Sequence, residues 1–229
     1  MKAGILLVVA LDPPVREKGR RKTSLLVEEL DKYVSGYKIG LPFLIKHGRR
    51  GIRELRKSTE KPIIVDLKLA DIGDVMAEVL RHLARLGVDA VIAHAFTGYT
   101  GALEDLSKAS MATGVGLIIV VSMSHRGSEE YIDRHVDEFL ELAARIRAKG
   151  VVAPATRPRV IRHVREVLGD TVEIYSPGIG IQGAEPGSAL CAGANYEIVG
   201  RLITRSGNPG ETARAIREMQ LERWLKCRG

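Results

Sequence analysis

The sequence predicts a single (β/α)8 barrel. Apolar, β-branched runs alternate with longer amphipathic stretches, as repeated βα units require. Runs such as Leu6–Ala10 are apolar on both faces, which is typical of parallel strands covered by helices. This alternation occurs eight times in 229 residues, close to the roughly 250 residues of this fold. Because no Pro/Ser-rich linker divides the chain, residues 1–229 are expected to form one domain.

Each expected element is placed where the sequence changes between an apolar, β-branched run and an amphipathic stretch. The expected strands are residues 5–11, 34–39, 62–66, 88–94, 115–122, 150–154, 172–176 and 196–200. The expected helices are residues 22–32, 42–57, 72–86, 100–110, 129–148, 157–168, 186–192 and 209–226.

Proline, glycine and capping residues mark the expected ends of these helices. Pro42 lies at a first helical turn, Thr156 is a candidate cap before Pro158, and Ser206–Pro209 opens the last helix. Three glycines are expected to end helical runs, namely Gly87, Gly150 and Gly169.

Composition limits where the protein acts and what it binds. The longest apolar runs fall far short of the ~20 residues of a membrane helix, and Met1–Gly4 is too short for a signal peptide, so a cytoplasmic protein is expected. Cys191 and Cys227 belong to no CxxC or Cys/His cluster, which favours reduced structural thiols. Only two Asn and two Gln occur beside abundant Arg and Glu, as is typical of thermophilic proteins.

The net charge of +7 fits a phosphorylated substrate, a nucleic acid or merely an arginine-rich surface. Aromatic residues make up only 4% of the chain, so platforms on which bases could stack are scarce. Nucleic-acid binding is therefore the weaker interpretation.

Polar residues gather where the expected strands end, and the active sites of (β/α)8 barrels lie at the carboxyl ends of the strands. In chain order these residues are Asp12, Lys38, Asp66, Lys68, Asp71, His94, Ser122–Ser124, Ser176–Gly178 and Gly200–Arg201.

The segment Asp66–Asp71 places two carboxylates around the ammonium of Lys68, which indicates a prepared charge array. Lys38 interrupts a strand that should be buried, so it needs a charged partner. Two other polar residues have a plainer interpretation: Asp12 alone reads as a turn or cap residue, and His94 as a hydrogen-bonded core histidine.

The glycine-rich segment Ser176–Gly183 follows the seventh strand, and Gly200-Arg201 follows the eighth. Glycine lets backbone N–H groups approach an anion, and arginine adds a permanent cation. Because the loops after these two strands form the usual phosphate site of the fold, a phosphate site is favoured over a surface turn.

Together these motifs resemble those of orotidine 5′-monophosphate decarboxylases of archaeal length, over nearly the whole chain. The motifs are Ala10–Asp12, Tyr37–Gly40, Asp66–Ile72, Met123–His125, Pro177–Gly183 and Val199–Arg201. The resemblance implies a barrel enzyme, a carboxy-lyase, that converts orotidine 5′-monophosphate to UMP in pyrimidine synthesis without a cofactor or metal.

The resemblance also implies a role for each matching residue. Lys68 would protonate pyrimidine C6, Asp66 would face the substrate carboxylate, and Asp71 would reach into the site of a partner subunit, making a homodimer. The substrate-binding residues would be Asp12 and Lys38 for the ribose, Ser124 for the pyrimidine, Pro177 lining the pocket, and Gly180, Gln182, Gly183, Gly200 and Arg201 for the phosphate.

One position departs from the family pattern. Val75 stands where a threonine usually contacts the ribose of the neighbouring site, and only Asp74 is nearby to compensate. Two other functions stay open. A magnesium-dependent phosphosugar enzyme shares the Asp-x-Lys-x-x-Asp block but generally has Glu where Lys38 stands. A basic RNA-binding module would explain the charge and not the strand-end residues.

Overall fold

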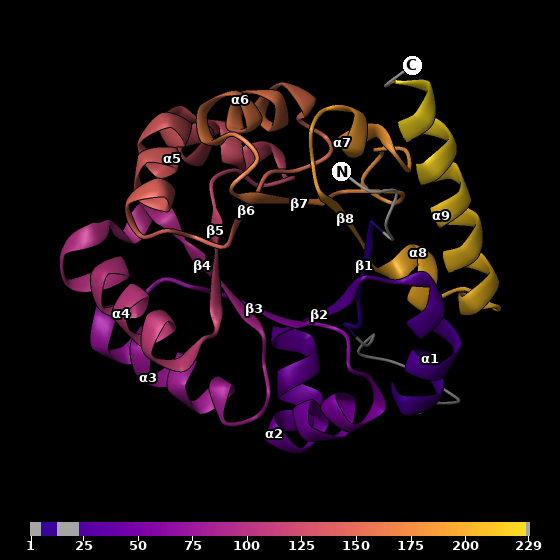
Figure 1. Cartoon of the computed structure of the whole chain (residues 1–229), viewed down its shortest axis with the longest axis horizontal. Helices are drawn as coiled ribbons and strands as arrows, with labels where there is room; N and C mark the ends of the chain where they lie inside the picture. The colour runs from indigo at the N-terminus through magenta and orange to yellow at the C-terminus, as the bar shows by residue number, and fades with distance from the viewer. Residues whose placement is uncertain (1–5, 13–22, 228–229) are drawn as a thin grey trace.

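The computed structural model describes residues 6–12 and 23–227. Within them, eight parallel strands pair in chain order and β8 pairs with β1, so the barrel closes as predicted (Figure 1). The strands are β1 (Leu7–Ala10), β2 (Gly36–Gly40), β3 (Ile63–Leu69), β4 (Ala90–His94), β5 (Gly116–Val120), β6 (Gly150–Val152), β7 (Glu173–Pro177) and β8 (Tyr196–Val199).

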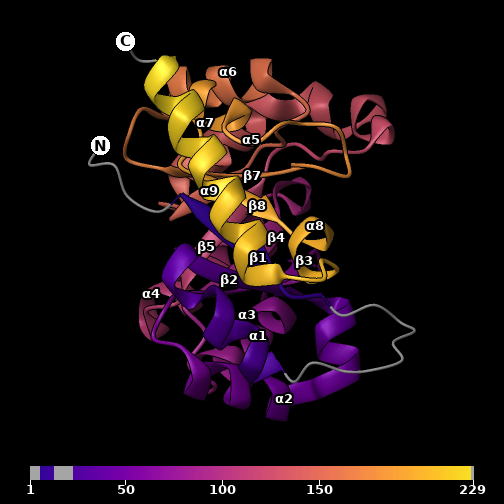
Figure 2. The ribbon, with the colours of Figure 1, turned by 90° about the vertical axis from the view of Figure 1, so that its right-hand side faces the viewer.

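Helices surround the barrel as an outer ring, which Figure 1 shows down the barrel and Figure 2 from the side. They are α1 (Thr23–Leu30), α2 (Leu41–Ser58), α3 (Gly73–Ala84), α4 (Glu104–Thr113), α5 (Val136–Arg145), α6 (Pro158–Leu168), α7 (Ser188–Cys191), α8 (Arg201–Thr204) and α9 (Pro209–Lys226). All eight predicted strands and eight predicted helices are present, whereas α8 was not predicted because it is a single turn. None of the helices in the described ranges has the length and apolarity needed to cross a membrane.

The core has two layers, because alternate residues of each strand face opposite sides. One layer fills the barrel and includes Val8, Ile64, Ile118 and Ile198. The other lies between the strands and the helices and is larger. Apolar side chains thus occupy the strand interiors, which leaves the strand ends for polar groups.

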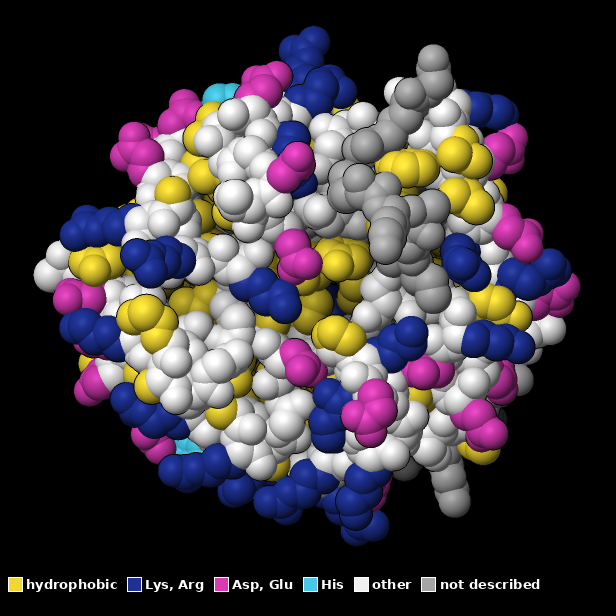
Figure 3. All heavy atoms as spheres, in the orientation of Figure 1, with side chains coloured by type: hydrophobic (Ala, Val, Ile, Leu, Met, Phe, Trp, Pro, Cys, Tyr) yellow, Lys and Arg dark blue, Asp and Glu magenta, His cyan; other side chains and the backbone are white. Residues whose placement is uncertain are grey.

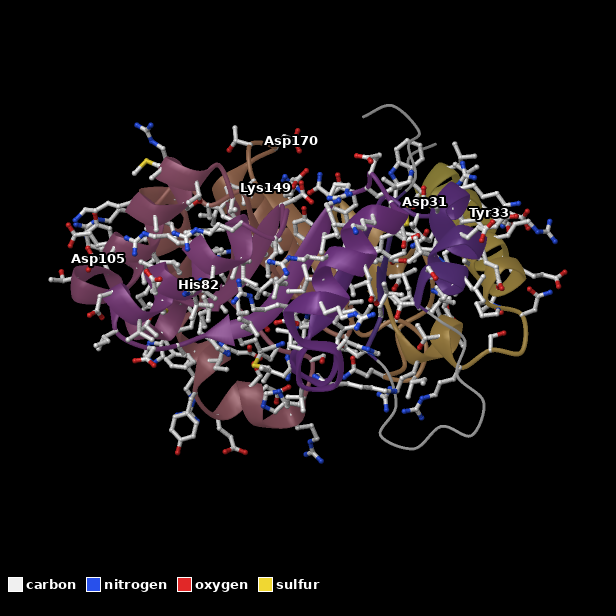
Figure 4. The ribbon with its side chains drawn as sticks, turned by 90° about the horizontal axis from the view of Figure 1, so that it is seen from below. Asp31, Tyr33, His82, Asp105, Lys149 and Asp170 are labelled. Atoms are coloured by element: carbon white, nitrogen blue, oxygen red, sulfur yellow. A yellow bond between two sulfur atoms is a disulfide. The ribbon has the colours of Figure 1, made fainter. Side chains whose placement is uncertain are left out.

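Figure 4 identifies the two ends of the barrel. Its labels place Asp31, Lys149 and Asp170 along the upper side, and these residues precede β2, β6 and β7. The upper side in that view is therefore the amino-terminal end, and the strands run from there to the opposite, carboxyl end. Figure 3 views the amino-terminal end, where basic side chains gather at the lower edge over α2. Part of the surplus positive charge thus lies on the helical rim.

Two predicted helices begin several residues later in the chain than expected, for visible reasons. Residues 129–148 form a helix only over α5, because Asp133 is engaged with Ser122 and Ser128 and the chain before Val136 forms 3₁₀ turns instead. Residues 100–110 become α-helical only at Glu104, after an irregular π-type turn in which Gly101 has a φ of +68°.

The expected helix ends were partly right. Asn208 caps α9 by accepting a hydrogen bond from Glu211 N. Thr156 is not the cap of α6, because Arg157 occupies that position and no side chain bonds there. Gly150 does not end a helix either. It begins β6, and the turn after α5 places Arg147 at a φ of +52°.

The prediction of reduced thiols is wrong. Cys191 at the end of α7 and Cys227 just after α9 form a disulfide, with their Cα atoms 5.8 Å apart. The two residues are 36 positions apart in the chain and come together because α9 packs beside α7 (Figure 2). Their sequence spacing therefore carried no signal of the bond.

A few predicted features lie outside the described residues. These are Met1–Gly4, residue 5 of the first expected strand and residue 22 of the first expected helix.

Candidate active site

The charged residues at the carboxyl ends of the first three strands form one network. Lys38 on β2 is 9% exposed, and its Nζ donates to Asp12 Oδ2 at 3.3 Å and to Asp66 Oδ2 at 3.2 Å. Lys68 donates to both oxygens of Asp66, at 2.9 and 2.8 Å. The buried Lys38 therefore has two carboxylate partners, Asp12 and Asp66. Asp66 also binds Lys68.

Asp12 also fixes the backbone beside Lys38, since its Oδ1 accepts from Gly40 N at 2.7 Å. A Cβ on Gly40 would lie 3.0 Å from that same oxygen, so the position favours glycine. Asp12 is therefore part of the array and not merely a turn residue.

The two ammonium groups set the charge state of Asp66. Burial by itself raises the pKa of this carboxyl, but the charges and hydrogen bonds of Lys38 and Lys68 outweigh burial and hold the pKa below its ordinary value. Asp66 therefore stays ionised at neutral pH, as a negative centre between two cations.

The backbone at Lys68 is strained. Its φ of +48° lies in the left-handed region, which residues with a side chain rarely adopt. The register between β3 and β4 shifts between Asp66 and Leu69, so Lys68 stands in a β-bulge. Such irregularities recur next to active sites, where they redirect a side chain.

His94 at the end of β4 is buried as predicted, with 8% exposure. Its Nδ1, however, does not form the hydrogen bond that was expected. This atom is buried and has no partner among the described residues. The ring packs against Phe96, with their centroids 4.5 Å apart. Burial and the charge of Lys68 lower the pKa of His94 to about 4, despite the opposing charge of Asp66, so the imidazole is neutral near the array at neutral pH.

The second carboxylate of the block does not join this network within the described part of the chain. Asp71 is exposed and accepts a hydrogen bond from Ile72 N at 2.7 Å. Two apolar neighbours, Ile72 and Val75, are 60% and 43% exposed. The segment thus presents a carboxylate and two apolar side chains to the outside of the subunit.

The loops after β5 and β7 meet directly. Gln182 Nε2 donates to Ser124 Oγ at 2.9 Å, across 58 positions of sequence. The loop that carries Gln182 folds on itself, with Gly180 N donating to Ala184 O at 2.8 Å and Ala184 N to Gly178 O at 3.2 Å.

Several glycines in this region have conformations that a side chain would strain. Gly180 and Gly183 have φ values of +79° and +100°, which explains why glycine occupies these positions. Pro177 ends β7 just before this loop. Gly200 follows β8, and Arg201 begins α8. The Arg201 side chain is exposed at the start of α8.

Sequence reasoning missed one residue that shapes the Ser124 loop. Arg157, between β6 and α6, pairs with Asp133 at 2.8 Å and donates to the carbonyl oxygens of Met123 and His125. Asp133 in turn accepts from Ser122 at 2.7 Å. One guanidinium thereby fixes both sides of Ser124. The only signal in the sequence was the position of Arg157 just before the helix that follows the sixth strand.

A family model places this chain among known proteins. The model for the orotidine 5′-phosphate decarboxylase / HUMPS family matches residues 6–216, which covers every strand of the barrel.

Individual relatives agree with this match. The orotidine 5′-phosphate decarboxylase of Aeropyrum pernix is 44% identical over 215 residues, which cover 93% of this chain and 87% of that protein. That of Pyrococcus furiosus is 39% identical over 219 residues, which cover 96% of this chain and 99% of that protein.

Solved structures give the same result. Orotidine 5′-monophosphate decarboxylase from Sulfolobus solfataricus matches with a TM-score of 0.87 and 32% identity, over 96% of this chain and 99% of that one. The Methanocaldococcus jannaschii enzyme, solved in complex with the inhibitor BMP, matches with a TM-score of 0.85 and 29% identity, over 94% and 98% of the two chains. The strand-end network, the closed barrel and these matches lead to one conclusion: this chain belongs to the orotidine 5′-phosphate decarboxylase / HUMPS family.

Proposed function

We propose that this protein decarboxylates orotidine 5′-monophosphate to UMP and carbon dioxide, a step of pyrimidine biosynthesis. The observation that carries the proposal is the Lys38–Asp66–Lys68 network at the carboxyl ends of β2 and β3. The family also includes metal-dependent phosphosugar enzymes, and Lys38 favours the decarboxylase. Its ammonium lies between Asp12 and Asp66, where it would repel a divalent cation bound by the same carboxylates.

Lys68 is the proposed proton donor. Loss of carbon dioxide leaves a carbanion-like C6 on the pyrimidine, with no obvious electron sink. An ammonium beside that carbon interacts with charge that develops only late in the reaction, so it lowers the barrier and not merely the energy of the bound substrate. At ~4 Å, two opposite unit charges attract by about 4 kcal/mol at an effective dielectric constant near 20. Transfer of the Lys68 proton to C6 then completes UMP.

The remaining members of the array have supporting roles in this proposal. Asp66 faces the departing carboxylate, and its low pKa supports this role because the two negative charges then repel each other. Asp12 and Lys38 hold the ribose hydroxyls. Ser124 contacts the pyrimidine, and its hydrogen bond to Gln182 supports this position because it links the pyrimidine and phosphate ends of the site.

The substrate phosphate is proposed to bind between the loops after β7 and β8. Arg201 supplies the charge and Gln182 a hydrogen-bond donor, while Pro177 lines the pocket. Backbone N–H groups near three glycines complete the site, namely Gly180, Gly183 and Gly200. The exposure of Arg201 at the start of α8, directly after β8, supports this assignment because its guanidinium can reach an anion in solution.

The active unit is proposed to be a homodimer in which Asp71 enters the site of the neighbouring subunit. Its exposure, together with that of Ile72 and Val75, supports this arrangement because a second subunit would cover the apolar side chains. Val75 cannot donate a hydrogen bond, so the ribose contact expected of threonine there is absent from this position.

A spectrophotometric assay with orotidine 5′-monophosphate tests the function. We expect turnover that EDTA does not change. Activity that EDTA abolishes and magnesium restores would instead assign the chain to the metal-dependent branch. Arg201→Ala tests the phosphate site and is expected to weaken UMP binding. An unchanged affinity for UMP would contradict the assignment of Arg201.

A further inference from the structure

Glu197 on β8 is a fully buried carboxylate outside the array described above, with 0% exposure. The adjacent Ile198 faces the barrel interior, so Glu197 faces the surrounding helices. Its Oε2 accepts from Gly187 N at 2.8 Å and from Gln220 Nε2 at 2.9 Å, and its Oε1 from Ala189 N at 3.0 Å. One carboxylate therefore joins β8, the start of α7 and the middle of α9.

Burying the Glu197 carboxylate costs free energy that packing a helix against β8 does not require. Removing a carboxylate from water is strongly unfavourable, even after relaxation of the surrounding protein. Burial is the main influence on Glu197 and raises its pKa, although hydrogen bonds from Gly187 and Gln220 oppose it. An apolar side chain would fill the same space without this cost, so the hydrogen bonds themselves need an explanation.

The groups that Glu197 holds suggest that explanation. Gly187 ends the loop that begins at Gly178 and carries Gln182, and its φ of +85° marks the exit of the chain into α7. On the other side of Glu197, β8 ends at Val199 and leads directly into Gly200 and Arg201. Glu197 thus joins the end of the Gln182 loop to the strand that leads to Arg201.

We propose that Glu197 is a positioning residue for the phosphate site. It holds the loop of Gln182 at a fixed distance from Arg201 and thereby sets the affinity for the substrate phosphate, without touching the substrate. This inference rests on the proposed assignment of Gln182 and Arg201 to the phosphate.

Two other links hold α7 and the Gln182 loop to α9 when Glu197 is changed. The disulfide between Cys191 and Cys227 fixes α7 to α9 independently of Glu197. An ion pair between Arg223 on α9 and Glu185 links α9 to the same loop. Glu197→Gln keeps the volume of the side chain and removes the charge and one acceptor oxygen.

The inhibition constants of UMP and of uridine, which lacks the phosphate, test the role. In Glu197→Gln we expect UMP to bind about 10-fold to 100-fold more weakly, as for the loss of a hydrogen bond to a charged group, with uridine unchanged. The KM for orotidine 5′-monophosphate should rise by a similar factor, with a smaller change in kcat. Equal weakening of UMP and uridine, or no weakening of UMP, would overturn the proposal.

Glu173→Gln is the matched control, because it changes another glutamate of the barrel strands. Glu173 lies at the start of β7, at the amino-terminal end, and accepts from the hydroxyls of Tyr175 and Tyr196. It should lower stability and leave both inhibition constants unchanged.

Two further variants remove ambiguity. If Arg201→Ala leaves UMP affinity unchanged, the phosphate site itself is misassigned; if it weakens UMP and Glu197→Gln does not, only the positioning role fails. If Glu197→Gln does not fold, Gln220→Leu removes one donor to Glu197 and leaves the carboxylate in place. A folded Gln220→Leu variant should show the same selective loss of UMP affinity, and unchanged affinity would overturn the proposal.

Discussion

Lys68 donates hydrogen bonds to both carboxylate oxygens of Asp66, at 2.9 and 2.8 Å, from a backbone position whose φ is +48°. The two residues are only two positions apart on β3, and Lys68 stands in the bulge of that strand. The strained backbone costs free energy that the ion pair and the surrounding sheet offset. If Lys68 is a strained proton donor, substitutions that relieve the strain should raise stability while activity is lost.

Replacing Lys68 tests this separation. Lys68→Ala and Lys68→Gly should both lower kcat by at least about 10³-fold, because the proton donor and its charge are lost. The glycine variant should be more stable than the alanine variant by about 1 kcal/mol, because glycine adopts positive φ without a steric penalty. Denaturant unfolding measures the second effect. Arg147→Gly is the control, since Arg147 has a φ of +52° and lies far from the array: it should gain stability and keep activity. Equal stabilities of the two Lys68 variants would contradict strain at this position.

Mixing two inactive variants tests the shared active site. Lys68→Ala and Asp71→Ala subunits should regain up to about a quarter of wild-type activity when hybrid dimers form, because each hybrid contains one intact site. Lys68→Ala mixed with Asp66→Ala should regain none, because Asp66 binds Lys68 within the same chain. Demonstrated hybrid dimers without recovered activity would argue against Asp71 acting across the interface.

His94 should make stability depend on pH. Its pKa is about 4 in the folded protein and about 6.5 in the unfolded chain, so the unfolded state binds a proton first as the pH falls. The stabilisation is complete above pH ~6.5 and is lost as the pH falls toward 4, by about 3 kcal/mol in total. Denaturant unfolding at several pH values in this range measures the free energy of unfolding. Its dependence on pH should be shallower for His94→Gln than for the wild type. His82→Gln, at the exposed site on α3 labelled in Figure 4, is the matched histidine substitution for comparison. If His94→Gln leaves the pH dependence of the free energy of unfolding unchanged, His94 does not cause it.

The disulfide should contribute to stability in a redox-dependent way. Closing a loop of 36 residues restricts the unfolded chain and is worth about 4 kcal/mol in the chain-entropy model. Adding a reductant should therefore lower the free energy of unfolding of the wild type and leave Cys191→Ser unaffected. Turnover at moderate temperature should persist, because the bond lies outside the candidate active site. Equal stability with and without reductant would show that the bond does not form in solution.

The sequence by itself determined the order of the elements and the residues at the strand ends. Hydrophobic periodicity is a local property, so it predicts the alternation of strands and helices without knowledge of the fold. Lys38 illustrates what this reasoning can reach: a lysine in a buried strand had to have a partner, and it has two. The two carboxylates, 26 and 28 positions away in the chain, reach Lys38 because β1 and β3 pair with β2 on either side. A cytoplasmic location and a thermophilic source stay predictions from composition.

Tertiary structure alone decided the features that depend on distant segments. Arg157 binds Asp133 and the backbone around Ser124, and Glu197 joins α7 to α9, although neither residue had a distinctive sequence pattern. The disulfide contradicted the sequence expectation for the same reason, since Cys191 and Cys227 meet only when α9 packs beside α7. Residue type and spacing report what a segment can form, whereas the partners of a buried polar group are set by which segments the closed barrel brings together.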